Sequence, residues 1–312
     1  MKIVVVEPLG IKTDTFECLK GEFEDKGHLF DYYTKRDENP DVLVSRMVDA
    51  DIVVISNIAL SADTLARCPQ LKMLSVAFTG LDHIDLDYCK QHGIDVFNAS
   101  GYSTVAVSEL AIGLMLDVYR QITVMDSTTR QLGGRGAFLG RELHGKTVGV
   151  VGTGAIGIQT IRLLLAFGCK VLAYSRTERA EVKDLGVEYV SLETLMSSSD
   201  IVTLHVPATK ETKHLIDAQK ISLMKPSAIL INTARGAVVD NDALAAALTN
   251  GSIAGAGIDV YETEPPLPAA HALLAAPNAV LLPHIAYATQ EAFDIRADIV
   301  MNNVRRWIET KK

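Results

Sequence analysis

Short apolar runs alternate with amphipathic stretches along almost the whole chain. The runs are continuously hydrophobic, which is typical of strands that are buried on both faces of a parallel sheet. Strands are predicted at residues 2–6, 50–56, 71–77, 94–98, 146–152, 170–175, 200–206, 228–234, 253–260 and 279–284. This alternation of strands and helices predicts an α/β fold in which helices cover both faces of each parallel sheet.

Helix signals fill the intervals between these strands. Residues 61–68 begin with Ser61, a good N-cap, and residues 241–251 run from a predicted N-cap at Asn241 to a glycine. Residues 101–122 predict one long helix. A last helix is predicted at 289–310, and we expect it to pack on the first sheet through an apolar face made of Phe293, Ile295, Ile299, Val300, Val304 and Ile308.

The length of the chain indicates more than one domain. Its 312 residues are about twice a typical domain length. We therefore expect two α/β units, one from residue 1 to about 100 and one from 101 to 286, with the long helix joining them.

Composition narrows the class of function. The net charge is −8 without a basic block, which argues against a nucleic-acid-binding surface. The most apolar helical stretch contains Glu109 and Asp117, so it predicts a buried helix and no membrane span. The cysteines show neither a CxxC pair nor zinc spacing, and they predict free thiols in the cytoplasm and no metal site: Cys18, Cys68, Cys89 and Cys169.

A glycine-rich stretch, "VGVVGTGAIG" at residues 148–157, follows a predicted strand and opens a helix. Gly152 permits the tight turn, Gly154 permits close approach of a pyrophosphate, and Gly157 permits close helix–strand packing. Ala155 and Ile156 begin the helix, whose free N–H groups favour phosphate. A purely structural glycine turn is the alternative, but the strand–turn–helix context favours a dinucleotide site.

The stretch "VLAYSRTER" at residues 171–179 lacks the acidic residue that this fingerprint places near the adenosine ribose. Ser175, Arg176 and Thr177 stand there instead. A guanidinium binds phosphate in a bidentate manner, so these residues predict NADP, with NAD possible. In the alternative, Arg176 is solvated and Glu178 reaches the ribose.

Three polar residues of the second half stand beside predicted strand ends. Arg235 lies in "NTARGAVVD", Glu264 in "DVYETEPPLP", and His284 ends "VLLPH". Ligands of open α/β sheets bind beyond the carboxyl ends of the strands, where all three are expected. Imidazole exchanges a proton near neutral pH, a nearby carboxylate orients it, and arginine pairs with a substrate carboxylate.

The stretches "ELHGKTVGVVGTGAIG", "NTARGAVVD", "GIDVYETEPPLP" and "LLPHIAYAT" resemble the D-isomer-specific 2-hydroxyacid dehydrogenase family over nearly the whole chain. The resemblance implies two Rossmann-like domains. One is a flavodoxin-like substrate domain, at 1–100 and 287–312, and the other is a dinucleotide-binding domain at 101–286. It also implies a catalytic cleft between them and a homodimer formed through the cofactor domain.

The resemblance also assigns roles to individual residues. His284 is implied as the acid/base, Glu264 as its partner, and Arg235 as the ligand of the substrate carboxylate and carbonyl. Substrate contacts are implied for Ala77, Phe78, Thr79, Gly80, Tyr102 and Tyr287. Cofactor contacts are implied for Thr104, Val206, Pro207, Thr212, Thr233, Ala234 and Asp259.

These observations favour an NADPH-dependent reductase of small 2-oxo acids, such as glyoxylate or hydroxypyruvate, that yields a D-2-hydroxy acid. One alternative is an NAD-dependent dehydrogenase of glycerate, 3-phosphoglycerate or a branched-chain hydroxy acid. Another is a non-catalytic protein that senses the cofactor. The sequence Ile285-Ala286-Tyr287 after His284 departs from the small-residue run common in the family, which leaves the size of the substrate open.

Overall fold

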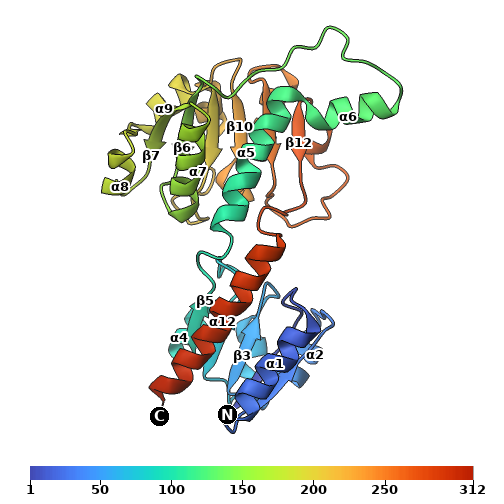
Figure 1. Cartoon of the computed structure of the whole chain (residues 1–312), viewed down its shortest axis with the longest axis vertical. Coiled ribbons are helices and arrows are strands. Elements are labelled where there is room, and N and C mark those ends of the chain that lie inside the picture. The colour runs from blue at the N-terminus through green and yellow to red at the C-terminus, as the bar shows by residue number, and fades with distance from the viewer. Residues whose placement is uncertain (312) are drawn as a thin grey trace. The chain divides into compact units, whose positions relative to one another are not determined.

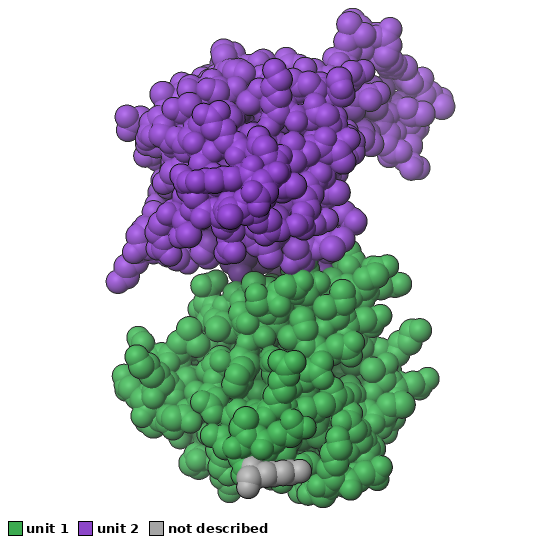
Figure 2. All heavy atoms as spheres, turned by 60° about the vertical axis from the view of Figure 1, so that its left-hand side comes forward, with its two compact units in different colours: residues 1–103, 288–312 green, residues 104–287 purple. Residues whose placement is uncertain are grey.

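The computed structural model describes residues 1–311, which form two compact units (Figure 2). Unit 1 comprises residues 1–103 and the C-terminal segment from residue 288 on, and unit 2 comprises residues 104–287. The chain therefore leaves unit 1 after Ser103 and returns to it after Tyr287. The two sheets consist of parallel strands, so the predicted α/β class is confirmed.

Unit 1 contains a five-stranded sheet in the order β2-β1-β3-β4-β5, the flavodoxin-like order. Its strands are β1 (Lys2–Val5), β2 (Leu29–Tyr32), β3 (Ile52–Ile55), β4 (Met73–Val76) and β5 (Asp95–Asn98). Its helices are α1 (Thr13–Glu24), α2 (Pro40–Met47), α3 (Ala62–Ala66), α4 (Leu86–Gln91) and α12 (Gln290–Thr310). The predicted N-cap Ser61 accepts a hydrogen bond from Thr64 N–H.

Helix α12 packs on the sheet of unit 1, as its pattern predicts (Figure 1). The Ser75 hydroxyl donates to the Val300 carbonyl at 2.9 Å, and Trp307 Nε1 donates to Asp95 at 2.7 Å. The prediction was wrong at Ile295, whose side chain is 47% exposed. Met301 and Trp307 are buried on this helix instead, because the buried stripe is rotated from the predicted one.

Unit 2 contains a seven-stranded sheet in the order β12-β11-β10-β9-β6-β7-β8. Its strands are β6 (Thr147–Val151), β7 (Lys170–Tyr174), β8 (Glu188–Tyr189), β9 (Ile201–Leu204), β10 (Ile229–Asn232), β11 (Gly255–Ile258) and β12 (Ala279–Leu281). Its helices are α5 (Thr104–Arg120), α6 (Ile122–Arg130), α7 (Ala155–Ala166), α8 (Ala180–Asp184), α9 (Leu192–Ser198), α10 (Ala218–Ser222), η1 (Gly236–Val238), α11 (Asn241–Thr249) and η2 (Ala272–Ala275).

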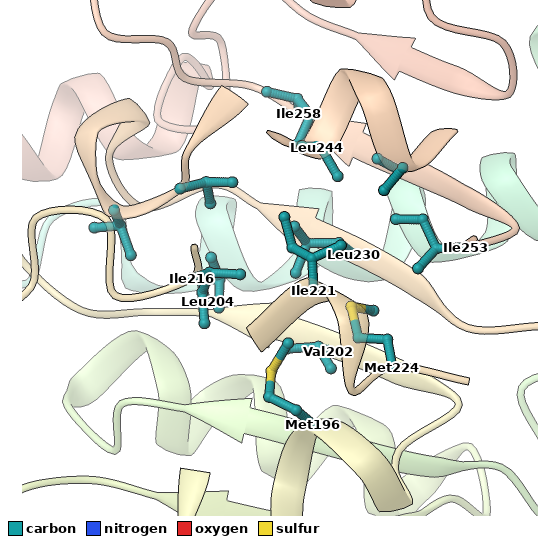
Figure 3. Packing of buried hydrophobic residues seen from close by; sticks show 14 of the residues in the cluster. Met196, Val202, Leu204, Ile216, Ile221, Met224, Leu230, Leu244, Ile253 and Ile258 are labelled. Atoms are coloured by element: carbon teal, nitrogen blue, oxygen red, sulfur yellow. The ribbon is translucent and has the colours of Figure 1, made fainter. Parts of the chain in front are cut away.

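Both faces of this sheet are covered by apolar side chains, which explains its continuously hydrophobic strands. Val202 and Leu230 pack in one cluster with residues of α9, α10 and α11, such as Met196 (Figure 3). Ile229 and Ile231 point to the opposite cluster, built on α5 and α7. Alternate residues of one strand thus fill separate cores.

Two helix boundaries of unit 2 differ from the predictions. The long helix begins at Thr104 and ends at Arg120, because Gln121 adopts a left-handed conformation with φ of 49° before α6 starts. The N-cap of α11 is Asp240, which accepts from Ala243 N–H, and Asn241 is the first helical residue. The adjacent Asp and Asn are both good caps, and the sequence does not distinguish them.

Candidate active site and cofactor site

The predicted site residues of unit 2 follow parallel strands of one sheet. Gly152 follows β6, Ser175 follows β7, and Arg235 lies three residues after β10. The register pairs Asn232 with both Leu204 and Ile258, so the ends of β9, β10 and β11 are level. Strands β7 and β8 lie on one side of β6, and β9 to β12 lie on its other side. Ligands of doubly wound sheets bind at this change of side.

The glycine turn after β6 has the geometry of a phosphate site. Gly152 has a φ of 99°, and a Cβ there would lie 2.4 Å from the His205 carbonyl oxygen. A Cβ on Gly157 would lie 2.0 Å from the Gly152 carbonyl oxygen. Gly154 has open space beside it and begins α7 without a side-chain cap. The turn therefore leaves the start of α7 accessible to a pyrophosphate, and these residues fit a dinucleotide.

The segment after β9 packs beneath this turn. Burial lowers the pKa of His205 to about 4, so its ring is neutral at pH 7. Its Nδ1 is buried and has no hydrogen-bond partner within residues 1–311. The Thr212 hydroxyl donates to the Pro207 carbonyl at 2.6 Å and accepts Thr209 N–H at 2.8 Å, which closes the loop that begins with Val206.

The segment after β7 presents a cation and two hydroxyls. Ser175 is half-buried, whereas Arg176 and Thr177 are exposed. Glu178, the alternative ribose ligand, forms an ion pair with Lys183 at 2.6 Å. Glu178 therefore has a partner in α8.

Asn232 shapes the loop that carries Arg235. This buried side chain accepts Ala234 N–H at 3.0 Å and donates to the Arg235 carbonyl at 3.0 Å. Arg235 Nη1 also donates to the Ala234 carbonyl at 2.8 Å. Thr233 lies between Asn232 and Ala234 in the sequence, and its buried hydroxyl has no hydrogen-bond partner in the described part of the chain. Asn232 was not among the predicted site residues, although a polar residue at the end of an apolar strand is a sequence signal for such a role.

Gly236 brings the Arg235 loop against the segment after β11. A Cβ on Gly236 would lie 1.9 Å from the Tyr261 carbonyl carbon, a distance that excludes any other residue without displacement of the backbone. The Tyr261 hydroxyl donates to the Leu282 carbonyl at 3.0 Å. The segments that carry Arg235, Glu264 and His284 are thus packed on one another, with Tyr261 in common.

His284 and Glu264 are in direct contact. Both carboxylate oxygens of Glu264 lie 2.8 Å from His284 Nδ1. A carboxylate only accepts hydrogen bonds, so Nδ1 carries the proton in this pair. His284 has a φ of 55°, and its ring lies 5.5 Å from that of Tyr287 in an edge-to-face arrangement.

Asp259 fixes the backbone around His284. Its two carboxylate oxygens accept the N–H groups of Ile285 and Ala286 at 2.8 and 2.9 Å, and its carbonyl accepts His284 N–H at 2.9 Å. Asp259 is fully buried, and burial raises its pKa against the opposing effect of those N–H groups. The side chain therefore holds the turn that presents His284, besides the cofactor contact predicted for it.

In unit 1, the predicted substrate loop follows β4. Ala77 is fully buried and its N–H donates to the Ile55 carbonyl at 2.6 Å, so this N–H is already engaged in the sheet. Ala99 N–H and Asn98 Nδ2 donate to the carbonyls of Phe78 and Thr79, respectively. The Ala77 N–H is therefore not available to a substrate carboxylate, contrary to the prediction. The predicted N–H contacts remain for residues 78–80. Tyr102 is buried, and the centre of its ring lies 6.4 Å from the centre of the Phe78 ring.

Residues 1–311 contain neither a candidate metal site nor a candidate membrane span. No cluster of three or more His, Cys, Asp or Glu side chains in this range has the geometry to hold a metal ion. No helix of this range is long and apolar enough to cross a membrane.

Comparison with known proteins identifies the family. Residues 112–286 match the family model described as D-isomer specific 2-hydroxyacid dehydrogenase, NAD binding domain. The chain belongs to this family. The predicted family and the predicted class of enzyme, an oxidoreductase, are therefore confirmed. The Gly152 turn lies within the matched NAD-binding domain.

Relatives of this 2-hydroxyacid dehydrogenase chain include reductases. A glyoxylate reductase from Thermococcus litoralis is 42% identical, over 83% of this chain and 80% of that protein. A hydroxypyruvate reductase from Thermotoga maritima is 40% identical, over 81% of this chain and 83% of that protein. Among solved structures, an acyclic imino acid reductase (Bsp5) in complex with NADPH and D-Arg has a TM-score of 0.88 at 28% identity, covering 100% of this chain and 98% of that one.

Proposed function

We propose that the protein reduces small 2-oxo acids, glyoxylate and hydroxypyruvate first among them, to D-2-hydroxy acids with NADPH. The observation that carries this proposal is the Glu264–His284 pair, with Nδ1 2.8 Å from the carboxylate, in the same unit as the glycine turn. The glyoxylate and hydroxypyruvate reductases among its relatives support the choice of substrates.

The proton for the reduction comes from His284. Glu264 accepts Nδ1–H, so the other ring nitrogen, Nε2, exchanges the proton with the substrate oxygen. The nicotinamide, when bound, supplies the hydride to C2. Arg235 binds the substrate carboxylate and the carbonyl oxygen, and its guanidinium stabilises the negative charge that develops on that oxygen. The carbonyl thereby becomes a hydroxyl, and His284 is left neutral.

We assign the remaining predicted contacts as parts of the same proposal. Residues 78–80 supply backbone N–H groups to the substrate carboxylate, and Tyr102 and Tyr287 limit the size of the substrate. The cofactor is held by Thr104, Gly152, Gly154, Ala155, Ile156, Gly157, Val206, Pro207, Thr212, Thr233, Ala234 and Asp259. The unpartnered hydroxyl of Thr233 supports its place in this set, since a buried polar group requires a partner.

The preference for NADPH rests on the segment after β7. Arg176 is exposed between the hydroxyls of Ser175 and Thr177, whereas the Glu178 carboxylate is paired with Lys183. An unpaired acid at this position repels a 2′-phosphate, and a guanidinium binds it.

A substrate panel tests the proposed function. Purified protein is assayed at the nicotinamide absorbance band with glyoxylate, hydroxypyruvate, pyruvate and 3-phosphohydroxypyruvate, each with NADH and NADPH in parallel. We expect the highest kcat/KM with NADPH and one of the first two acids. The absence of turnover with every pair, together with retained cofactor binding, would instead indicate a cofactor-sensing protein.

Replacing Arg176 by alanine is expected to raise the Kd for NADPH by about 10- to 100-fold, because a hydrogen bond to a charged group contributes roughly 1.5–3 kcal/mol. The Kd for NADH is expected to change less than twofold. Isothermal titration with both cofactors measures the two effects. Equal weakening of both would remove Arg176 from the 2′-phosphate site. Arg162→Ala, which removes a guanidinium paired with Glu181 at the surface, serves as the matched control.

We further propose that the protein is a homodimer formed through unit 2. Helix α6 and the loop after it form an arm between Gln121 and Arg141 that projects from this unit (Figure 1). At the end of the arm, the Arg141 N–H donates to the Tyr119 carbonyl. This arm carries Leu132, 97% exposed, and Leu139, 82% exposed. Apolar side chains so exposed indicate a surface that a second copy covers.

Sedimentation is expected to give twice the 33.8 kDa of one chain. The Leu132→Glu/Leu139→Glu variant should sediment as a monomer, because charges cannot be buried in an apolar interface without a large cost. Leu29→Glu, at a site 66% exposed in unit 1, is the control and should remain dimeric. A wild-type monomer at micromolar concentration would contradict the proposal.

The reaction is proposed to occur in the cytoplasm. The four thiols of the chain are free, at Cys18, Cys68, Cys89 and Cys169. Unpaired cysteines are ordinary in a reducing compartment, where disulfides are rare.

A further inference from the structure

The phenol of Tyr189 lies between two loops of unit 2. Its hydroxyl donates to Thr153 Oγ1 at 2.9 Å and accepts Arg179 N–H at 3.1 Å. Thr153 stands between Gly152 and Gly154 in the glycine turn and is 1% exposed. Arg179 lies three residues after Arg176 in the exposed loop and is the N-cap of α8. One side chain therefore contacts both the turn proposed for the pyrophosphate and the segment proposed for the 2′-phosphate.

The position of this phenol is fixed by the sheet. Tyr189 is the last residue of β8 and pairs with Ala173 of β7. The next N–H, of Val190, donates to the Ala173 carbonyl at 2.9 Å. The Tyr189 ring also packs on the hydrophobic cluster that covers this face of the sheet. Its hydroxyl is therefore presented from a rigid strand, although it bonds to two loops.

The segment from Arg176 to Arg179 gains an anchor through Tyr189. All four of its residues are exposed, and its ion pair between Glu178 and Lys183 lies at the surface, with both side chains more than half exposed. Arg179 is the N-cap of α8 and makes no side-chain capping bond. The bond from its N–H to Tyr189 connects the segment to the buried Thr153 of the glycine turn.

We propose that Tyr189 is a cofactor-positioning residue that couples the glycine turn to the Arg176–Arg179 segment and thereby strengthens discrimination in favour of a 2′-phosphorylated dinucleotide. The inference rests on the proposed function. A segment held in its binding conformation loses less conformational entropy when the ligand binds, so its anchor contributes to affinity without touching the ligand. Only a cofactor that contacts the segment through a 2′-phosphate gains the full affinity that this anchor provides.

Tyr189→Phe tests the inference, because it keeps the ring and its packing and removes only the hydroxyl. We expect the Kd for NADPH, measured by fluorescence titration, to rise about five- to tenfold, as for the loss of an ordinary hydrogen bond with its ordering effect. The Kd for NADH should rise less than twofold, and kcat at saturating NADPH should be unchanged. Equal weakening of both cofactors, or no change in either, would overturn the inference.

Two further variants separate coupling from general destabilisation. Thr153→Val removes the other partner, and the Tyr189→Phe/Thr153→Val double variant should bind NADPH no more weakly than the weaker single variant, because both remove the same connection. Additive losses would count against a shared connection. Tyr32→Phe removes a phenol hydrogen bond to Glu17 in unit 1 and should leave both Kd values unchanged. If the wild type binds neither cofactor, the proposed function itself fails, which this series distinguishes from failure of the coupling.

Discussion

Replacing His284 by alanine is expected to lower kcat for 2-oxo acid reduction by about 10²- to 10⁴-fold, the range that a positioned general acid contributes. The Kd for NADPH should stay within about twofold, because the imidazole is assigned to the proton on the substrate oxygen and to no cofactor contact. Steady-state kinetics and cofactor titration measure the two quantities. A variant that turns over at a rate near that of the wild type would refute the role of His284.

Unit 2 offers a matched control for this variant. A second histidine–glutamate pair joins His271 and Glu262 at 3.3 Å, beside Tyr261 and two residues before Glu264. Glu264→Gln keeps the shape of the side chain and removes its charge, so it should lower kcat. In a chain that already carries His284→Ala, the same substitution should lower kcat little further. Glu262→Gln should leave kcat unchanged. Equal losses in the two glutamine variants would indicate a structural effect of the whole loop.

Replacing Arg235 by lysine is expected to raise KM for the 2-oxo acid by about 10- to 100-fold. Lysine keeps the charge but loses the planar fork that pairs with a carboxylate through two hydrogen bonds, and bonds to charged groups contribute roughly 1.5–3 kcal/mol. The comparison of glyoxylate with its amide sharpens the measurement. The amide lacks the negative charge, so the penalty of the substitution should shrink for it. An unchanged KM for glyoxylate would contradict a bidentate contact.

The sequence predicted the parts of the fold that depend on local pattern. Buried strands such as β10 are mostly apolar because both faces are covered. Gly152 and Gly157 are required because a Cβ at either position would collide with a backbone carbonyl oxygen. The short β8 was missed, because two residues give no periodicity. β2 was missed because it is an edge strand with one residue buried, Phe30.

Two side chains that form hydrogen bonds to the loops of the candidate site, Asn232 and Tyr189, were not predicted from the sequence. Arg235 and His284 stand at strand ends, where side-chain chemistry alone suggests a role. Asn232 and Tyr189 act through hydrogen bonds whose partners are set by the turn geometry and by strand pairing. The contact of Gly236 with Tyr261 joins residues far apart in sequence, and only the folded backbone reveals it.

The discontinuous sequence of unit 1 has a consequence for synthesis on the ribosome. Every strand of unit 2 precedes α12 in the sequence, so all of them are synthesised before the helix that completes unit 1. The N-terminal sheet must wait with the surface around Ser75 and Asp95 uncovered until the final turns of α12 arrive. The first part of the chain to be made is therefore among the last to be completed.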